Sequence, residues 1–108
     1  MNQNRALSML GIATKAGKTV TGEFSTEKAV KEGKAFLVIV ASDASDNTKK
    51  KFRNMCDYYQ VTIKEFADKD SLGAACGKDF RASLAVIDEG LSKAVLKKMD
   101  RCDNLEVQ

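Results

Sequence analysis

Ala35-Phe-Leu-Val-Ile-Val-Ala41 is the longest strongly apolar run in this chain of 108 residues, and it decides the fold. Residues 36–40 form an unbroken series of aliphatic and β-branched positions, which predicts a central strand buried on both faces. The run is far shorter than the ~20 residues that a helix needs to cross a bilayer. It therefore predicts the middle of a globular sheet that is covered on both sides.

Helical and extended patterns alternate on either side of this strand. Phe52, Met55, Cys56 and Tyr59, for example, fall at the i, i+3, i+4 and i+7 positions of an amphipathic helix. The expected helices lie around residues 6–13, 25–32, 46–59 and 71–76 and after Asp88, and the other expected strands lie around 18–21, 61–66 and 84–87. This alternation predicts an α/β protein, a three-layer α-β-α sandwich in which a mixed sheet of about four strands carries helices on both faces.

The length and composition indicate one folded domain. The hydrophobic fraction of 44% and the charged fraction of 31% are those of an ordinary globular protein. We expect a single domain over residues 1–102 and a frayed tail over 103–108. Residues 1–5 lack the charged-then-apolar order of a signal peptide, so we expect a cytoplasmic location.

The cysteine and histidine counts exclude several kinds of catalytic site. Cys56, Cys76 and Cys102 are widely spaced with no C-x-x-C pair, and the chain contains no histidine. Without histidine a Cys–His or Ser–His nucleophile is impossible within this chain, and no cluster offers ligands for zinc. We expect reduced thiols that fill the core, no metal and no cofactor.

The charges are unevenly distributed along the chain. Residues 1–54 carry ten Lys and Arg against five Asp and Glu, whereas residues 55–108 carry eight against ten. A basic half suggests one face that meets a polyanion, although surplus lysine is also common on solvated helices. The candidate cations are Lys15, Lys18, Lys28, Lys31 and Lys34, with the outward-facing Lys49, Lys50, Lys51 and Arg53 of the third helix.

A near-match to a phosphate-binding P-loop, Gly11-Ile-Ala-Thr-Lys-Ala-Gly17-Lys18-Thr19, raises a nucleotide-using enzyme as an alternative. The motif requires four residues between its glycines, and five lie here. A P-loop also follows a strand and opens a helix, whereas this segment ends a helix and leads into a strand. The pattern therefore favours a glycine helix stop.

The carboxylate pairs Asp68/Asp70 and Asp88/Glu89 stand where helices begin, so we interpret them as caps.

Several separated motifs resemble one known family. They are Leu10-Gly-Ile-Ala-Thr-Lys-Ala-Gly-Lys18, Thr21-Gly22, Lys28-Ala29 and Leu72-Gly-Ala-Ala-Cys-Gly77, and their spacing follows the expected element order over residues 5–100. Together they resemble the kink-turn-binding ribosomal protein superfamily of the L-seven-Ae and L-thirty-e type. Ala41-Ser-Asp-Ala-Ser-Asp-Asn-Thr-Lys-Lys50 is similar to its bacterial YlxQ-like branch in particular.

The resemblance implies a three-layer α-β-α fold that binds structured RNA without catalysis. In kink-turn binders the helix after the glycine turn begins Gly-x-Asn-Glu-x-x-Lys, and its polar side chains reach sheared G·A pairs. Gly22 and Lys28 match this pattern, but Phe24 replaces the Asn and Ser25 replaces the Glu. The loss of such groups costs ~1–3 kcal/mol of discrimination each, by analogy with base readout in DNA. Phe24 could instead stack on an unpaired base, or pack back onto its own helix.

We therefore expect a non-catalytic protein that binds structured ribosomal or other RNA. The expected contact residues are Lys18, Gly22, Glu23, Phe24, Ser25, Lys28, Lys31, Asp43, Lys78, Phe80 and Arg81. We expect a monomer with no membrane contact, whose partners are RNA and a possible ribosomal or other protein. The alternative is a protein–protein interaction module of the same fold that has lost specific kink-turn RNA binding.

Overall fold

The structure is a computed structural model that describes the backbone of residues 3–107 and the side chains of residues 5–99. Helices and strands alternate through the described range as the sequence predicts. The elements are α1 (Gln3–Lys15), β1 (Thr19–Thr21), α2 (Glu23–Lys31), β2 (Leu37–Val40), α3 (Asp46–Tyr59), β3 (Thr62–Glu65), α4 (Lys69–Ala75), β4 (Ser83–Val86) and α5 (Glu89–Val107).

The strands form one mixed sheet in the order β1-β4-β2-β3. β4 pairs antiparallel with both β1 and β2, whereas β2 and β3 pair in parallel. β1, β2 and β3 therefore run in one direction and β4 runs against them. The prediction of a mixed, four-stranded sheet is confirmed.

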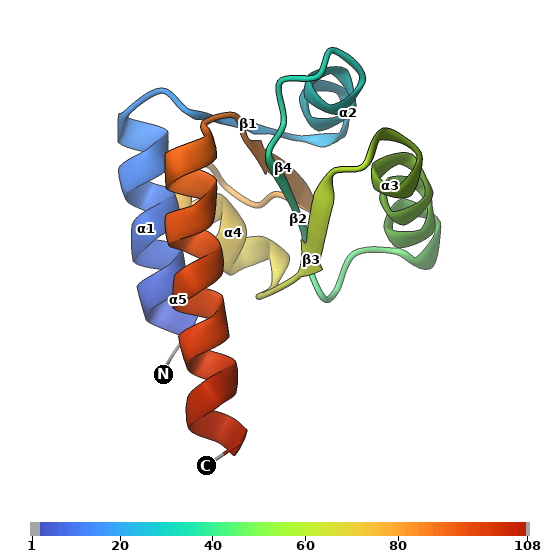
Figure 1. Cartoon of the computed structure of the whole chain (residues 1–108). Helices are drawn as coiled ribbons and strands as arrows, with labels where there is room; N and C mark the ends of the chain where they lie inside the picture. Colours follow the sequence, from blue (N-terminus) through green and yellow to red (C-terminus); the bar gives the residue numbers. More distant parts are fainter. Residues whose placement is uncertain (1–2, 108) are drawn as a thin grey trace.

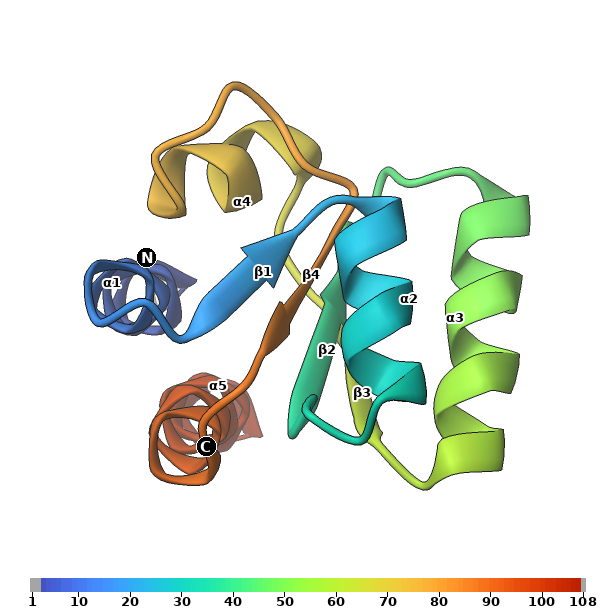
Figure 2. The same cartoon turned by 90° about the horizontal axis from the view of Figure 1, so that it is seen from above.

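Helices cover both faces of this sheet. Figures 1 and 2 show α2 and α3 on one face and α1, α4 and α5 on the other, which is the predicted three-layer sandwich. All four residues of β2 and all four of β4 are buried, as expected for the middle strands of a covered sheet. Phe36 was predicted to share this burial, but it lies one residue before β2 at the rim of the sheet, and its side chain is 43% exposed.

Local signals set most of the helix ends. Gly17, at φ 73°, follows α1 in the left-handed conformation that favours glycine. Asp68 accepts the N–H of Ser71 and Asp88 accepts the N–H of Leu91, so both carboxylates cap helices as interpreted from the sequence. α2 begins at Glu23, two residues before the predicted start, because Gly22 already provides the turn. The backbone of α5 is helical as far as Val107, and the predicted fraying of residues 103–108 lies outside the described side chains.

The remaining sequence expectations concern thiols, metals and membranes. Cys56 and Cys76 are buried free thiols, as predicted, and Cys102 lies outside the described side chains. Within the described part of the chain, no His, Cys, Asp or Glu residues cluster as three or more potential metal ligands. Among the described helices, none combines the length and the apolar character required to span a membrane.

Candidate nucleic-acid interface

Three helices begin at one edge of the sheet. Because β1, β2 and β3 are mutually parallel, their carboxyl ends lie at the same edge, and α2, α3 and α4 start directly after them. The positive ends of the helix dipoles therefore point to this edge, which favours negative charge. In open α/β sheets, ligands also tend to bind outside the carboxyl ends of strands.

The loop that leads into β4 reaches the same edge. The N–H of Gly22 donates to the carbonyl of Ser83 over 2.9 Å, and the N–H of Ala41 donates to the carbonyl of Ala82 over 2.9 Å. These bonds bring together three segments that the sequence separates: the turn and first residues of α2 (22–25), the loop 41–45 and the loop 77–82. We call this set the loop edge. Two of the predicted contact regions, the Gly22 turn and the loop containing Lys78 to Arg81, thus become neighbours.

The first turn of α2 has no side-chain cap. Gly22 has φ 93° and ψ 161°, a conformation that side-chain-bearing residues rarely adopt, and as glycine it offers no capping oxygen. The N–H groups of residues 23–25 therefore have no partner within the helix. By contrast, α3 and α4 are capped by the side chains of Ser45 and Asp68. The loop edge thus contains one helix start whose donors remain available to an anion.

Arg81 is held beside this open turn. Its Nε donates to the Thr21 hydroxyl over 3.2 Å, and its Nη1 donates to the carbonyl of Phe80 over 2.7 Å. No carboxylate partner is found for it among the described residues. Lys78 in the same loop is exposed, and the Phe80 side chain is 57% exposed. The loop therefore presents an oriented guanidinium, a lysine and an aromatic ring.

Close packing on α4 supports the loop. Gly73 is buried in α4, and a Cβ built there would lie 2.5 Å from the Cα of Phe80 and 2.7 Å from the carbonyl oxygen of Asp79. The carbonyl of Gly73 also accepts the N–H of Lys78 over 2.8 Å. Only glycine permits the loop to approach the helix this closely, which the sequence alone did not reveal.

Asp43 has a structural bond rather than a free carboxylate. Its Oδ1 accepts the N–H of Lys69 over 2.9 Å, and the neighbouring Ser42 N–H donates to the carbonyl of Ala67 over 2.7 Å. These contacts fasten the loop 41–45 to the start of α4. Asp43 thus lies at the loop edge, where its carboxylate fixes the position of the loop 41–45.

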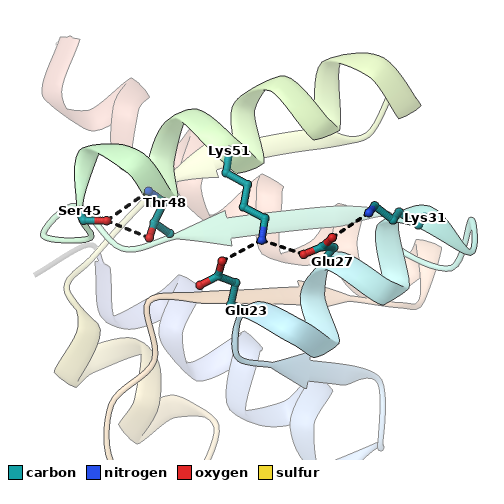
Figure 3. Close-up of polar contacts among 6 residues, drawn as sticks. All are labelled: Glu23, Glu27, Lys31, Ser45, Thr48 and Lys51. Carbon is teal, nitrogen blue, oxygen red and sulfur yellow. Dashed lines mark hydrogen bonds and ion pairs between the residues drawn. The ribbon is translucent and has the colours of Figure 1, made fainter.

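An ion-pair network joins α2 to α3 next to the edge (Figure 3). Lys51 Nζ lies 2.8 Å from a carboxylate oxygen of Glu23 and 2.8 Å from one of Glu27, and Lys31 Nζ lies 2.7 Å from the other oxygen of Glu27. Hydrogen bonds from Lys31 and Lys51 lower the pKa of Glu27 to about 2. The two carboxylates raise the pKa of Lys51 in return. Glu23 and Lys51 are consequently paired across the two helices, and Lys31 is paired with Glu27 of its own helix, before any ligand arrives.

Of the cations opening α3, which the sequence predicts to face largely outward, Lys50 and Arg53 are exposed, whereas Lys49 and Lys51 are only partly exposed. Lys49 Nζ lies 3.4 Å from Glu65, and Arg53 lies 3.3 Å from the same carboxylate. Packing of α3 against α2 and β3 places acidic side chains within reach of these cations. The Glu27–Lys31 pair could have been read from its i, i+4 spacing, but the bonds to Lys51 and Glu65 depend on the tertiary arrangement.

Phe24 and Lys28 stand apart from this network. The Phe24 side chain is 79% exposed, so it does not pack back onto its helix. Lys28 is exposed one turn further along α2, and the described residues provide it with no ion-pair partner. The solvent-facing side of α2 therefore carries an uncovered ring and an unpaired cation next to each other.

Lys18 is not part of the loop edge. Its carbonyl accepts the N–H of Ile87 over 2.8 Å, which places it at the beginning of β1, the opposite end of the strand from Gly22. The same segment confirms the interpretation of the P-loop near-match, because α1 ends at Lys15 and β1 begins at Thr19. The Thr19 hydroxyl is bonded to the Thr14 hydroxyl over 2.9 Å, and a strand, not a helix, begins directly after Lys18.

The three-layer sandwich and its loop edge place the chain in a class of small α-β-α proteins with an anion-favouring edge. The model of the ribosomal protein L7Ae/L30e/S12e/Gadd45 family matches residues 4–96, and the chain belongs to this family. The resemblance inferred from the sequence motifs is thereby confirmed.

Named relatives cover most of the chain. The RNA-binding protein YlxQ of Bacillus subtilis (strain 168) is 37% identical over 92 residues, which span 85% of this chain and 92% of that protein. Large ribosomal subunit protein eL30 of Methanoregula boonei is 39% identical over 83 residues, which span 74% of this chain and 81% of that protein. These relatives are named as RNA-binding and ribosomal proteins rather than as enzymes.

Solved structures agree with the fold. A protein of unknown function from Bacillus halodurans C superposes with a TM-score of 0.86 at 40% identity, covering 89% of this chain and 97% of that one. The 15.5kD RNA binding protein of Giardia lamblia superposes with a TM-score of 0.77 at 22% identity, covering 96% and 89%, and supports the fold alone.

Proposed function

We propose that this protein binds structured RNA, ribosomal RNA in the first place, through the loop edge and the exposed side of α2. It does so without catalysis and without a cofactor. The observation that carries the proposal is the uncapped first turn of α2 with Arg81 fixed beside it. Free backbone donors at a helix N-terminus and an oriented guanidinium are groups that bind phosphate oxygens.

Three cations supply the phosphate contacts in this proposal. Lys28, Lys78 and Arg81 have no carboxylate partner among the described residues, so binding RNA breaks no ion pair at these positions. Lys31 and Lys51 contribute less, because Glu23 and Glu27 already compensate their charge. Phosphate contacts fix the register of an RNA without reading its sequence.

The target is broader in this proposal than a kink-turn. Phe24 cannot donate or accept the hydrogen bonds that the family Asn makes, and Ser25 offers a hydroxyl where the family has a carboxylate. The relatives named above as RNA-binding and ribosomal proteins support RNA as the ligand class. A ribosome-associated role would place the protein in the cytoplasm.

A gel shift with ribosomal RNA fragments and a kink-turn RNA tests the proposal. We expect affinity to fall steeply with salt, because each neutralised phosphate releases counterions. Lys28→Glu should weaken binding and reduce the slope of log affinity against log salt by about one. Lys97→Glu is the matched control, since Lys97 is exposed on α5, on the other side of the sheet (Figure 2).

Two results would count against RNA binding. The first is wild-type protein that binds none of these RNAs, or binds them independently of salt. The second is an equal effect of Lys28→Glu and Lys97→Glu. Tight binding to a protein partner that Lys28→Glu leaves unchanged would support the alternative, an interaction module of the same fold.

A further inference from the structure

A groove lies beside the exposed side of α2, away from the ion-pair network. It has a volume of about 290 Å³ and its walls include Phe24, Lys28 and Lys34. Val20 of β1 and Ile87, just after β4, contribute apolar surface to it. We call this hollow the α2 groove. It is continuous with the loop edge, because Phe24 belongs to both.

The ring of Phe24, which lines this groove, is largely exposed to solvent. Phe24 is 79% exposed, in contrast to Phe52 of α3, which is fully buried. Covering an exposed aromatic side chain is favourable in proportion to the apolar area that it removes from water. A flat ligand that stacks on the ring would gain this energy together with the preference of aromatic groups for offset stacking.

The charges around the groove are mostly positive. Lys28 has no ion-pair partner among the described residues. Lys34 contacts Glu32 at 3.3 Å, but their side chains are 66% and 42% exposed, and exposed pairs of this kind are weak. Lys18 is close to the Ile87 end, since its carbonyl accepts the Ile87 N–H. Glu32 is the one carboxylate among the residues lining the groove.

We propose that the α2 groove takes one unpaired nucleotide of the bound RNA, whose base stacks on Phe24 and whose phosphate is held by Lys28 and Lys34. This assignment rests on the proposed function and extends it from the loop edge to a second contact. An aromatic ring beside cations is the arrangement with which proteins hold single-stranded nucleotides. The Ser25 hydroxyl, which also lines the groove and has no bond to the described residues, can bond the base or the ribose.

Phe24 stands where the family Asn bonds the base edges of a paired motif. In its place, the exposed ring offers a stacking surface that any base can use. Every base has a π face, so stacking on Phe24 selects unpaired nucleotides without selecting their sequence. The structure thus assigns a physical role to the departure from the family pattern at this position. The protein should prefer structured RNA with an unpaired nucleotide next to the helix that the loop edge binds.

Tryptophan fluorescence provides a direct test, because the chain contains no tryptophan. Phe24→Trp would place a single reporter at the groove. The probes are a hairpin RNA with a short single-stranded uridine tail and the same hairpin with a blunt end. We expect the tailed hairpin to quench the reporter and the blunt one to leave it nearly unchanged. Tyr58→Trp is the control, because Tyr58 on α3 is also 79% exposed and does not line the groove.

The RNA affinities of Phe24 variants provide the second part of the test. Phe24→Ala should weaken binding of the tailed hairpin by about 5- to 100-fold, a clearly larger loss than it causes for the blunt hairpin. Phe24→Tyr, which keeps the ring, should retain the preference for the tail. Because Phe24 is exposed, none of these variants should lower the thermal unfolding midpoint measured by circular dichroism.

The outcomes separate the groove from the proposed function. If both hairpins bind and Phe24→Ala affects them equally or not at all, the groove assignment is overturned while RNA binding at the loop edge stands. If a protein partner rather than RNA loses affinity in Phe24→Ala, the groove is a protein-binding surface and the assignment is again overturned. If neither hairpin nor any ribosomal RNA fragment binds the wild type, both proposals fail.

Discussion

Gly73→Ala tests whether close packing on α4 holds the loop that carries Arg81. The added Cβ would lie 2.5 Å from the Cα of Phe80 and 2.7 Å from the carbonyl oxygen of Asp79, whereas ordinary contact begins at 3.4 Å. The loop must therefore retreat by roughly 1 Å, because both obstacles are backbone atoms that no side-chain rotation can move. The substitution should thus change the stability of the fold and the shape of the loop edge together.

Two opposing contributions set the change in the free energy of unfolding of Gly73→Ala. Overpacking of a buried site costs about 1–3 kcal/mol, whereas alanine stabilises a helix by up to about 1 kcal/mol relative to glycine. We expect a net loss of about 1–2 kcal/mol in the free energy of unfolding, which lowers the melting temperature by about 5–15 °C in a domain of this size. RNA affinity should fall as well, since the displaced loop moves Arg81 away from Thr21.

Gly11→Ala is the matched control for the assay, which is thermal and urea unfolding followed by circular dichroism. A Cβ at Gly11, inside α1, would lie 3.4 Å from the carbonyl oxygen of Ala75, an ordinary contact. This variant should be as stable as the wild type or up to about 1 kcal/mol more stable. If Gly73→Ala proves as stable as Gly11→Ala and binds RNA with unchanged affinity, the packing argument is refuted.

Three further predictions concern a carboxylate, a helix cap and a thiol. The pKa of Glu27 lies at about 2 against its ordinary 4.5, because Lys31 and Lys51 bond its charged form. Its contribution to stability is therefore complete above pH 4.5 and disappears as the pH falls towards 2, so the stability gap between wild type and Glu27→Gln should close over that interval in urea titrations. Ser45→Ala removes the cap of α3 and should cost about 1 kcal/mol in urea unfolding, whereas Ser45→Asp should retain the cap. Burial raises the pKa of the Cys56 thiol to about 11, so iodoacetamide at pH 8 should leave Cys56 unmodified in the folded protein, as followed by mass spectrometry of its peptide.

Each of these three predictions would be contradicted by one particular result. A stability gap for Glu27→Gln that is the same at pH 7 and at pH 2 would show that the ion pairs do not support the fold. Equal stability of Ser45→Ala and wild type would mean that water replaces the cap without loss. Cys56 that reacts as fast in the folded protein as in urea would show that the thiol is accessible.

The order of helices and strands could be predicted because it depends on local patterns. The apolar run of β2, the helical spacing in α3 and the helix stop at Gly17 each act within a few residues. The errors fell at element ends, as at Phe36 and at the start of α2, where burial depends on which neighbours reach the rim of the sheet. A rim position has no sequence pattern of its own.

The candidate site could be predicted only as a set of segments. The Gly22 turn and the loop before β4 were identified separately, and β1–β4 pairing is what joins them. The ion pairs of Lys51 could not be predicted from the sequence, because its partners lie 28 and 24 positions earlier on another helix. Phe24 had two interpretations of equal standing, and only its 79% exposure excludes packing onto the helix.

The sequence by itself determined the fold class and the family, because periodicity, glycine stops and short motifs act over neighbouring residues. The tertiary structure alone decided which charges are available to a ligand. Coulomb interactions depend on distance in space, and folding brings Glu23 and Glu27 to Lys51 while leaving Lys28 unpaired among the described residues. The tertiary structure also decided that the ring of Phe24 faces solvent beside a groove, and the groove proposal rests on this exposed ring and on the unpaired Lys28.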